Sequence, residues 1–445
     1  MRFRIERDAL AEAVAWVARA LPARPVVPVL SGLLIDAVGG SASLSCFDYD
    51  VSARIEVSAD VAEPGTALVP GRLLAEITRS LAGSQAEFAD DADSVLLTCG
   101  TAEFTLVKLA VEEYPSLPEL PASAGTVEGV HLAAAVSQVA PSASRDDNLP
   151  MLTGVFAEIE GGTITLAATD RYRLAVRGLP WTPGRDDVRT SALIPAKALA
   201  EAARTMTSGG RVSIALRDGA AHSGANGAQG ARAGLDTRAA DGMIGFEGGG
   251  RRLTARLLGG DFIKYSSRFP AEFGSRADMD AGPLIEAVRR VALVAERGSP
   301  VRLVFDADEV VIEAGSQGQA RAVEHVPATF SGDERVIAFN PAYLLDGLNA
   351  AATPWVSADA DAAATKAANG KPAAKAANGK PAAKPAAKAA AKRPAPGRIR
   401  LEFTSSIKPA VISWVPGEQD GDTGGEPETP AFRYLVVPLR MPGSA

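Results

Sequence analysis

Apolar and polar residues alternate along three long segments of the chain, and each segment predicts a set of paired β-strands. Residues 30–57 align without a gap with residues 152–179, and residues 300–326 form a looser third copy. In the first two copies a Gly-Gly pair, at 39–40 or 161–162, separates two alternating stretches. Alternation with a period of two predicts strands with one buried face, and the glycine pair predicts a hairpin between them. A third strand follows each hairpin.

An amphipathic helix is predicted after each copy and another before it. The later helices begin at Pro70, Pro195 and Pro341, because proline in the first turn removes no hydrogen bond. The earlier helices are predicted by the spacing of apolar residues at 7–20, 130–141 and 282–296. The fold class is therefore α+β, with three similar domains that each pack two helices on a mostly antiparallel sheet. Their predicted limits are 1–122, 123–276 and 277–445.

Two stretches of small residues interrupt the repeats and account for the unequal sizes of the domains. The second domain contains a long loop at 218–242, and the third contains an Ala/Lys/Pro insert at 357–397. With almost no large apolar side chains, the insert cannot offset the entropy of ordering and is predicted to be disordered. We interpret it as a solvated spacer, with contact between its lysines and nucleic acid as the alternative. The acidic stretch 417–430 lacks the residue order of a calcium loop and is predicted to be solvated.

Charge and composition argue against several classes of protein. The chain has 46 Lys and Arg against 53 Asp and Glu, a net charge of −7, and because residues 360–397 contribute +7 the remainder carries −14. Two cysteines, Cys46 and Cys99, and three histidines offer little material for a metal site, so no metal, cofactor or disulfide is expected. No apolar run reaches the ~18–20 residues of a membrane span, and the charged N-terminus is unlike a signal peptide. A cytoplasmic protein without membrane contact is expected.

No motif in the sequence indicates catalysis. There is no G-x-S-x-G elbow, no Walker A loop and no H-E-x-x-H pair. Asp48 and Asp170 occupy equivalent positions in the first two repeats, where a catalytic carboxylate would hardly recur. We interpret these acids as turn-forming residues. The chain is therefore not expected to be an enzyme.

Four segments carry a resemblance to a known family: ARPVVPVLSGLLI (23–35), ATDRYRLAV (168–176), FNPAYLLDGLNA (339–350) and YLVVPLRM (434–441). In this order, on a threefold repeat, they resemble the β sliding clamp, the β subunit of bacterial DNA polymerase III. The resemblance implies a head-to-tail homodimer in which six clamp domains close into a ring, with the helices lining the hole. It also implies a non-catalytic processivity factor that encircles duplex DNA without reading its sequence and associates with the nucleoid. The implied partners are the replicative polymerase, the clamp loader and repair polymerases.

An encircling ring explains how an acidic protein holds DNA, because closure of the ring prevents escape and only a mildly basic inner wall is needed. Basic residues recur two and nine positions after the helix-starting prolines of the first two domains, whereas the third domain has Tyr343 and Ala350 there. We predict that these basic residues contact DNA. The resemblance adds Arg24, because the residue at this position touches duplex DNA in the family. The predicted DNA-binding residues are Arg24, Arg72, Arg79, Lys197 and Arg204.

The resemblance also implies an apolar pocket between the second and third domains, where short motifs of partner proteins dock. An aliphatic cleft buries a partner's Leu or Phe for about 1.5–3 kcal/mol each, and polar groups such as Asn340 and Arg173 then fix the direction of the peptide. This sequence departs from the family where Ile263 replaces a proline and where Arg171 and Tyr172 replace a Gly-His pair. Carried over by position, the predicted pocket residues are Leu152, Thr169, Arg171, Tyr172, Arg173, Leu174, Ile263, Asn340, Tyr343, Ile407, Val436, Val437, Pro438, Leu439 and Arg440.

The joint between subunits is predicted to pair an edge strand of the first domain with the third domain of a second copy. The hairpin at 94–110 supplies the edge strand, and Leu293 and Val294 match apolar joint positions of the family. Two alternatives remain open. One is a peptide-binding scaffold that does not encircle DNA, and the other is a diverged clamp copy that confers tolerance to a pocket-directed inhibitor.

Overall fold

The computed structural model describes residues 1–185, 188–206, 210–217, 242–296, 298–315, 320–353, 397–415 and 432–440. They form two compact units. Unit 1 comprises Met1–Val136, Ala143–Asp170 and Gly178–Ile263, and unit 2 comprises Ser137–Ser142, Arg171–Arg177 and the chain from Lys264 onward. The predicted loop, insert and acidic stretch lie outside the described residues, except for Gly242 and Gly397.

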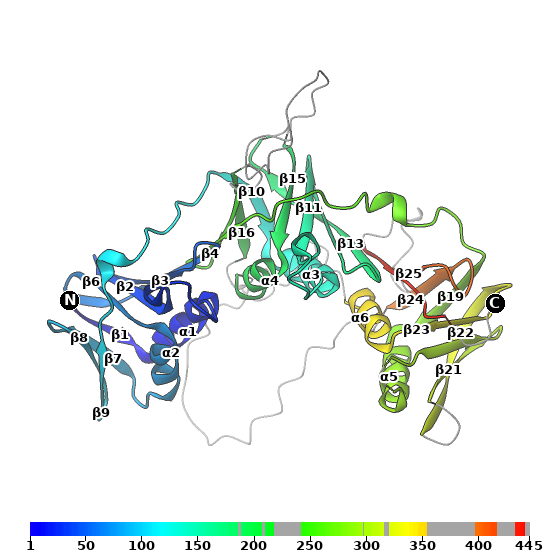
Figure 1. Ribbon diagram of the computed structural model, residues 1–445, viewed down its shortest axis with the longest axis horizontal. Helices are drawn as coiled ribbons and strands as arrows, with labels where there is room; N and C mark the ends of the chain where they lie inside the picture. Colours follow the sequence, from blue (N-terminus) through cyan, green and yellow to red (C-terminus); the bar gives the residue numbers. More distant parts are fainter. Residues whose placement is uncertain are drawn as a thin grey trace, which may run out of the picture. The chain divides into compact units, whose positions relative to one another are not determined.

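The first repeat lies in unit 1 and contains two helices, α1 (Arg7–Val17) and α2 (Gly71–Ser80), which lie side by side (Figure 1). Glu6 caps α1 by accepting a hydrogen bond from the backbone N–H of Ala9 at 2.7 Å. Short 3₁₀ turns are η1 (Ala18–Ala20), η2 (Pro28–Ser31) and η3 (Val111–Glu113). The strands are β1 (Arg2–Glu6), β2 (Gly32–Val38), β3 (Ser41–Phe47), β4 (Val51–Ser58), β5 (Asp60–Glu63), β6 (Gly65–Pro70), β7 (Gln85–Asp90), β8 (Ser94–Cys99) and β9 (Ala102–Val107).

The second repeat follows the same order of elements. Its helices are α3 (Gly129–Val139) and α4 (Ala196–Thr205), and its 3₁₀ turns are η4 (Ala140–Ser142) and η5 (Pro150–Leu152). The strands are β10 (Ser123–Glu128), β11 (Gly154–Glu160), β12 (Thr163–Thr169), β13 (Arg173–Pro180), β14 (Thr182–Pro183), β15 (Arg189–Pro195), β16 (Arg211–Arg217), β17 (Met243–Gly248) and β18 (Arg251–Arg256).

The third repeat lies in unit 2, where its helices α5 (Ala281–Val291) and α6 (Pro341–Ala351) pack against each other. Its 3₁₀ turns are η8 (Ser266–Arg268) and η9 (Ala292–Val294). The strands are β19 (Ser275–Asp280), β20 (Val301–Phe305), β21 (Glu309–Gly315), β22 (Arg321–Gly332), β23 (Val336–Phe339), β24 (Arg398–Phe403), β25 (Ala410–Val415) and β26 (Phe432–Val436). Since β19 begins at Ser275 and pairs with β22 and β24, the third repeat starts before the predicted limit at residue 277.

The sheets of unit 1 join the first repeat to the second. One sheet has the strand order β5-β1-β7-β8-β9, with the predicted 94–110 hairpin formed by β8 and β9 and with β9 at its edge. A second has the order β14-β10-β16-β17-β18-β4-β3-β2-β6, so that β4 of the first repeat pairs with β18 of the second. At this junction Ser52 lies opposite Thr254, and their buried hydroxyls hydrogen-bond at 2.6 Å. A further group in unit 1 has the order β15-β11-β12.

In unit 2 the second repeat joins the third in the same way. Residues Arg173–Arg177 of β13 pair with β26, and the order continues through β25, β24, β19, β22 and β21 to β20 and β23. The third strand of a repeat, β4 or β13, thus pairs each time with a strand of the following repeat. The strand pairs named above are all antiparallel, which agrees with the predicted α+β class.

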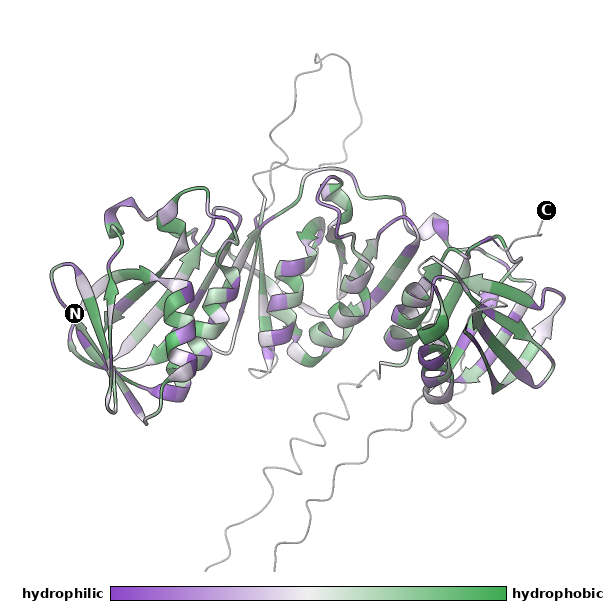
Figure 2. Ribbon diagram, turned by 60° about the horizontal axis from the view of Figure 1, so that its bottom comes forward, coloured by the Kyte–Doolittle hydropathy of each residue, from purple (hydrophilic) through white to green (hydrophobic). Residues whose placement is uncertain are grey.

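The cores lie between the helices and the sheets. In Figure 2 the helices carry both hydrophilic and hydrophobic residues, as expected of elements with one exposed and one buried face. Phe3 and Phe88 stack with ring centroids 4.7 Å apart in the first repeat, and Phe305 and Phe330 stack at 5.1 Å in the third. Within the described residues, no helix combines the length and apolar character needed to cross a bilayer.

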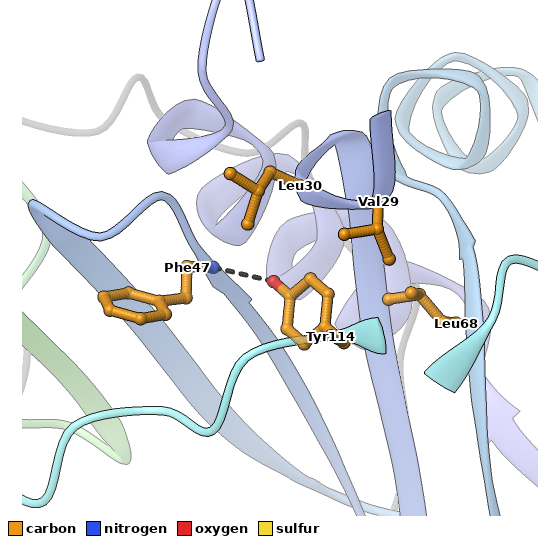
Figure 3. Close-up of a cluster of buried hydrophobic side chains, with 5 residues drawn as sticks. All are labelled: Val29, Leu30, Phe47, Leu68 and Tyr114. Carbon is orange, nitrogen blue, oxygen red and sulfur yellow. Dashed lines mark hydrogen bonds between the residues drawn. The ribbon is translucent and has the colours of Figure 1, made fainter. Parts of the chain in front are cut away.

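A smaller apolar cluster surrounds Tyr114 in the first repeat (Figure 3). Its hydroxyl accepts a hydrogen bond from the backbone N–H of Phe47 at 2.8 Å, while its ring packs with Val29, Leu30 and Leu68. This cluster ties the segment after β9 to the strands β3 and β6.

Turn residues explain the spacing of the repeated strands. Gly39, Gly40 and Gly161 have φ of 62°, 90° and 54°, as a tight hairpin requires. The next turn contains Tyr49 in the first repeat and Arg171 in the second, at φ of 73° and 82°, which are left-handed values that side chains rarely adopt. The predicted helix-starting prolines differ slightly: Pro341 opens α6, whereas the other two stand one residue before α2 and α4.

Candidate functional site

The helices α2 and α4 present the predicted basic residues at exposed positions. Each helix buries the leucine four residues after its proline, Leu74 or Leu199, and this fixes the opposite face toward water. The side chains on that face include Arg72, Arg79, Lys197 and Arg204. In α6 the corresponding positions hold Tyr343 and Ala350, so this helix lacks the two cations.

Arg24 lies in an exposed loop that Arg72 holds against α2. Arg72 donates from Nη2 to the carbonyl oxygen of Pro22 at 2.9 Å, two residues before Arg24. Arg24 itself is exposed, and Val26, beside it, is 89% exposed. Arg72 therefore forms a hydrogen bond within the protein, and part of its role is to position this loop.

Arg204 is not isolated, because it shares a carboxylate with a second arginine. Glu201, one turn earlier on α4, accepts from Arg204 Nη2 at 2.7 and 2.8 Å. Its Oε1 also accepts from Nη1 of Arg19, in η1 of the first repeat, at 3.1 Å. Burial raises the pKa of Glu201 above its ordinary value, and the positive charges of Arg19 and Arg251 oppose that rise.

A buried arginine links the first and second repeats. Arg251 on β18 donates from Nη1 to the carbonyl oxygen of Thr205 at 2.9 Å and from Nη2 to Glu12 on α1. Trp16 on α1 donates from Nε1 to the Thr205 hydroxyl at 2.9 Å. We call Glu12, Trp16, Arg19, Glu201, Arg204, Thr205 and Arg251 the junction cluster.

Sequence reasoning missed most of the junction cluster. Glu201 has one weak signal in the sequence: a glutamate stands six residues after the helix-starting proline in both α2 and α4, between the two recurring cations. Arg19, Trp16 and Arg251 have none, since their partners lie far away along the chain.

The helices as a group are less acidic than the rest of the chain. The six helices and η1 carry eight basic residues, Arg7, Arg19, Arg72, Arg79, Lys197, Arg204, Arg289 and Arg290, and six acids, Asp8, Glu12, Glu76, Glu201, Glu286 and Asp346. The helices therefore carry a mild positive balance, in contrast to the acidic chain as a whole.

In unit 2 the structure brings several predicted pocket residues together. The backbone oxygen of Tyr172 accepts a hydrogen bond from the N–H of Val437 at 2.8 Å, and the ring of Tyr172, 56% exposed, stacks on Tyr343 with centroids 6.1 Å apart. The N–H of Leu439 donates to the carbonyl oxygen of Ala338 at 2.8 Å, which aligns the segment after β26 with β23. Exposed aromatic surface therefore lies beside an apolar chain segment.

The polar groups predicted to orient a peptide already form hydrogen bonds within the protein. Arg173 lies beneath Tyr343, its guanidinium 4.7 Å from the ring centroid, and donates to Asp346 at 2.5 Å and to the carbonyl oxygen of Pro141 at 2.6 Å. Oδ1 of Asn340 caps α6 by accepting from the N–H groups of Ala342 and Tyr343. These contacts assign both residues a part in holding the surface together.

The remaining predicted pocket residues differ in exposure. Leu152, Thr169 and Ile263 belong to unit 1, where the first two are buried and Ile263 is half-buried. In unit 2, Leu174, Val436 and Pro438 are buried, Val437 and Leu439 are half-buried, and Arg171, Ile407 and Arg440 are exposed. Within the described ranges, no group of three or more His, Cys, Asp or Glu side chains gathers as a metal site.

The residues predicted for the subunit joint face solvent in the single chain. Leu293 is 82% exposed and Val294 is half-buried, both in η9 at the end of α5. The strand β22 pairs with β19 only from Ala328 to Gly332, whereas Arg321–Pro327 pair with β21 alone. The first repeat has the edge strand β9. These are the open edges that a second copy could cover.

Comparison with family models matches three consecutive parts of the chain. Residues 1–118 match the N-terminal domain of the DNA polymerase III beta subunit, residues 126–264 match its central domain, and residues 266–365 match its C-terminal domain. The chain is 51% identical over 444 residues to the beta sliding clamp of Streptomyces coelicolor, covering 100% of both proteins. It is 42% identical over 355 residues to the beta sliding clamp homolog GriR of Streptomyces muensis, covering 80% of this chain and 90% of that protein.

Solved structures show the same fold. The DNA polymerase sliding clamp of Bacillus subtilis superposes with a TM-score of 0.76 at 22% identity, covering 99% of each chain. A sliding clamp of Pseudomonas aeruginosa, solved bound to griselimycin, superposes with a TM-score of 0.74 at 24% identity, covering 99% of this chain and 100% of that one.

Proposed function

This chain belongs to the DNA polymerase III beta subunit family, the β sliding clamps, and we propose on that premise that it encircles duplex DNA as a head-to-tail homodimer. As a member of that family it is a non-catalytic processivity factor of DNA replication. In this proposal the three domains span 1–122, 123–274 and 275–445, with the last limit moved from the predicted residue 277 to the first residue of β19. The protein works in the cytoplasm, at the nucleoid.

The observation that carries the proposal is the repeated way in which consecutive repeats join. The third strand of one repeat pairs with a strand of the next, β4 with β18 and β13 with β26. The first repeat keeps an edge strand, β9, and the third keeps a half-paired strand, β22. Two chains placed head to tail would join these edges by the same kind of strand pairing. The two joints formed in this way would close a ring. Unpaired edges are otherwise a liability that a folded protein covers.

The proposed DNA-facing residues suit a ring better than a protein that grips by contact. Tight non-specific binding depends on neutralising many phosphates, and a charge of −14 on the chain outside residues 360–397 is poorly suited to that. The helices, by contrast, carry eight basic and six acidic residues. We assign the weak, mobile phosphate contacts to Arg24, Arg72, Arg79, Lys197 and Arg204.

The second proposed site is the peptide pocket predicted from the sequence. Its support in unit 2 is the exposed Tyr172–Tyr343 stack beside the segment from Val437 to Arg440. Polymerases, the clamp loader and repair polymerases would dock short apolar motifs there. Arg173 and Asn340 shape this surface from behind, through Asp346 and the cap of α6, more than they address the peptide.

The two alternatives are not favoured. A diverged clamp copy is disfavoured because the identity to the Streptomyces coelicolor sliding clamp, 51% over the whole length, exceeds the 42% to the clamp homolog GriR. A scaffold that binds peptides without DNA does not account for the recurring cations on α2 and α4, which no peptide pocket in unit 2 requires.

The test is retention on DNA with and without ends. Full-length protein is loaded by its clamp loader onto primed circular DNA and onto the same DNA after linearisation, and primer extension by the cognate polymerase is measured. We expect long products and lasting retention on circles, and loss within the time of sliding from linear ends. Equal retention on both templates, or a monomer by mass in solution, would contradict encirclement.

A further inference from the structure

The carboxylate of Glu201 is shared by two arginines from different repeats. Its Oε1 accepts from Arg19 at 3.1 Å and from Arg204 at 2.7 Å, and its Oε2 accepts from Arg204 at 2.8 Å. The Glu201 side chain is only 21% exposed, whereas those of Arg19 and Arg204 are 47% and 52% exposed. Both cations are therefore accessible to a ligand, while the anion that holds them is largely covered.

The backbone carrying these residues is fixed across the junction of the first two repeats. Thr205 donates its hydroxyl to the carbonyl oxygen of Glu201 at 2.7 Å and accepts from Nε1 of Trp16 at 2.9 Å. Arg251 donates to the Thr205 carbonyl oxygen at 2.9 Å. The last turn of α4 is thus tied to α1 and to β18. This arrangement holds the backbone that carries Arg19 and Arg204 in a defined geometry.

We propose that Arg19, Glu201 and Arg204 form a moderated phosphate site for duplex DNA, an inference that rests on the proposed function. The two guanidinium groups offer forked donors that match phosphate oxygens. Glu201 positions both groups and cancels one of their two charges, which leaves a net charge of +1. The contact with phosphate is therefore weak and readily exchanged, as a protein that moves along its template requires.

Duplex DNA fits this surface better than an acidic peptide does. The same pattern of cation, glutamate and cation occurs on α2 and on α4, at two, six and nine residues after the proline. A backbone with one charge per about 1.7 Å of duplex can meet a pattern repeated on successive domains, whereas a short peptide needs only one site. Lys197, seven residues before Arg204, extends the basic face of α4.

The first repeat provides a matched control for Glu201. Glu76 occupies the equivalent position in α2, six residues after Pro70, and is exposed. In the part of the chain that the structure describes, Glu76 makes no ion pair. Removing the Glu76 charge changes the charge of the same kind of helix face without releasing any arginine, so it measures the effect of the added net charge alone.

The experiment measures binding of the full-length protein to a short labelled duplex by fluorescence anisotropy across a range of salt concentrations. We expect Glu201→Gln to raise the association constant about threefold to tenfold and to steepen the salt dependence by ~0.9 in the slope. Glu76→Gln should raise the association constant less than about twofold, since it removes an exposed, solvent-screened charge without releasing an arginine from an ion pair. Arg19→Gln, at an exposed position, should lower it about threefold to tenfold.

Each outcome decides for or against the proposal. The gain of Glu201→Gln should vanish when Arg19 and Arg204 are also changed to Gln. Equal effects of Glu201→Gln and Glu76→Gln would overturn the proposal, as would an Arg19→Gln variant that binds DNA normally. Altered affinity for an acidic peptide with unchanged DNA binding would overturn it too. A wild type that fails the circular-DNA assay would refute the proposed function itself, whereas retention of the wild type there isolates a failure to this inference.

Discussion

Tyr49 and Arg171 occupy the same turn in the first two repeats, and the repeat imposes a left-handed backbone on both, with φ of 73° and 82°. A residue with a Cβ atom is destabilised there by about 1–2 kcal/mol relative to its preferred conformations. The resemblance places glycine at the position of Arg171 in the family, and glycine adopts this conformation freely. The departure seen in the sequence therefore has a structural cost.

Arg171→Gly is expected to stabilise the protein. The relief of backbone strain exceeds the added entropy of glycine in the unfolded chain, so the free energy of unfolding should rise by about 0.5–1 kcal/mol. Urea denaturation of the two proteins measures the change. Arg171→Ala is the control, because it shortens the side chain but keeps the Cβ atom and should give no gain. Equal stabilisation by both substitutions would show that strain is not the cause.

Cys46 gives the first repeat a predictable response to alkaline pH. Burial raises its pKa from 9.0 to about 12, while its thiol donates to the carbonyl oxygen of Val17. Because the folded state holds this proton more tightly than the unfolded state does, its stabilising effect is complete below pH 9 and is lost between pH 9 and 12. Burial likewise raises the pKa of Tyr114, which acts in the same direction.

The free energy of unfolding of the wild type, measured in urea at a series of pH values, should fall above pH 9. Cys46 should account for about 1.4 kcal/mol of this fall per pH unit. Cys46→Ala should lose that share of the slope, although it lowers stability at neutral pH by leaving a small cavity. An unchanged slope in this variant would assign the alkaline sensitivity elsewhere. The native thiol should also resist labelling at pH 8.

Helices and strands could be read from the sequence because their signals are local. The alternating stretches became β2–β4, β11–β13 and β20–β22, and each helix-starting proline stands at or next to the first residue of α2, α4 or α6. The junction cluster could not be read in this way. Trp16 and Thr205 are 189 residues apart, and Arg251 and Glu12 are 239 apart, so their pairing follows from how β4 and β18 join.

The candidate pocket was only partly accessible to sequence reasoning for the same reason. Position in the family places Arg173 in the pocket, but it does not show that the side chain is 9% exposed and bonded to Asp346 and Pro141. A guanidinium in that setting fastens η4 to α6 within unit 2. Gly347 on α6 has a comparable packing role, since a Cβ atom there would meet the ring of Tyr434 at 2.5 Å.

Arg173→Ala is therefore expected to loosen unit 2 locally. Since Asp346 is 45% exposed and regains water, the cost should be about 2 kcal/mol rather than the larger value of a fully buried pair. Hydrogen exchange should quicken in α6 and in residues 137–142. Arg189→Ala is the control, because Arg189 and Glu160 form a pair that is 80% and 64% exposed and should contribute less than about 0.5 kcal/mol. Unchanged exchange in α6 would refute this role for Arg173.

For the whole molecule, the two junctions within the chain indicate what a third would look like. Trp16 and Gln138 hold equivalent places in α1 and α3, and each donates to the end of a helix in the following repeat, to Thr205 Oγ1 at 2.9 Å and to the carbonyl oxygen of Ala350 at 2.8 Å. The third repeat has α5 in the same place, but no repeat follows it in the described chain. Since no helix end of a following repeat packs there within the described residues, the side chain of Leu293, just after α5, remains exposed.

Changing Leu293 and Val294 together to alanine should convert the dimer into a monomer at micromolar concentration. Leu293 is 82% exposed in the single chain, so its truncation removes little internal packing and the monomer should keep its fold. In the dimer the two lost side chains would weaken association by about 1.5–3 kcal/mol for each one fully buried, and by symmetry at both joints. Sedimentation velocity measures the mass, and circular dichroism checks the fold. Val38→Ala, at a position that is 56% exposed at the end of β2, is the matched control and should remain dimeric. If the double variant stays dimeric, η9 is not at the joint; if the control also dissociates, the loss is not specific to η9.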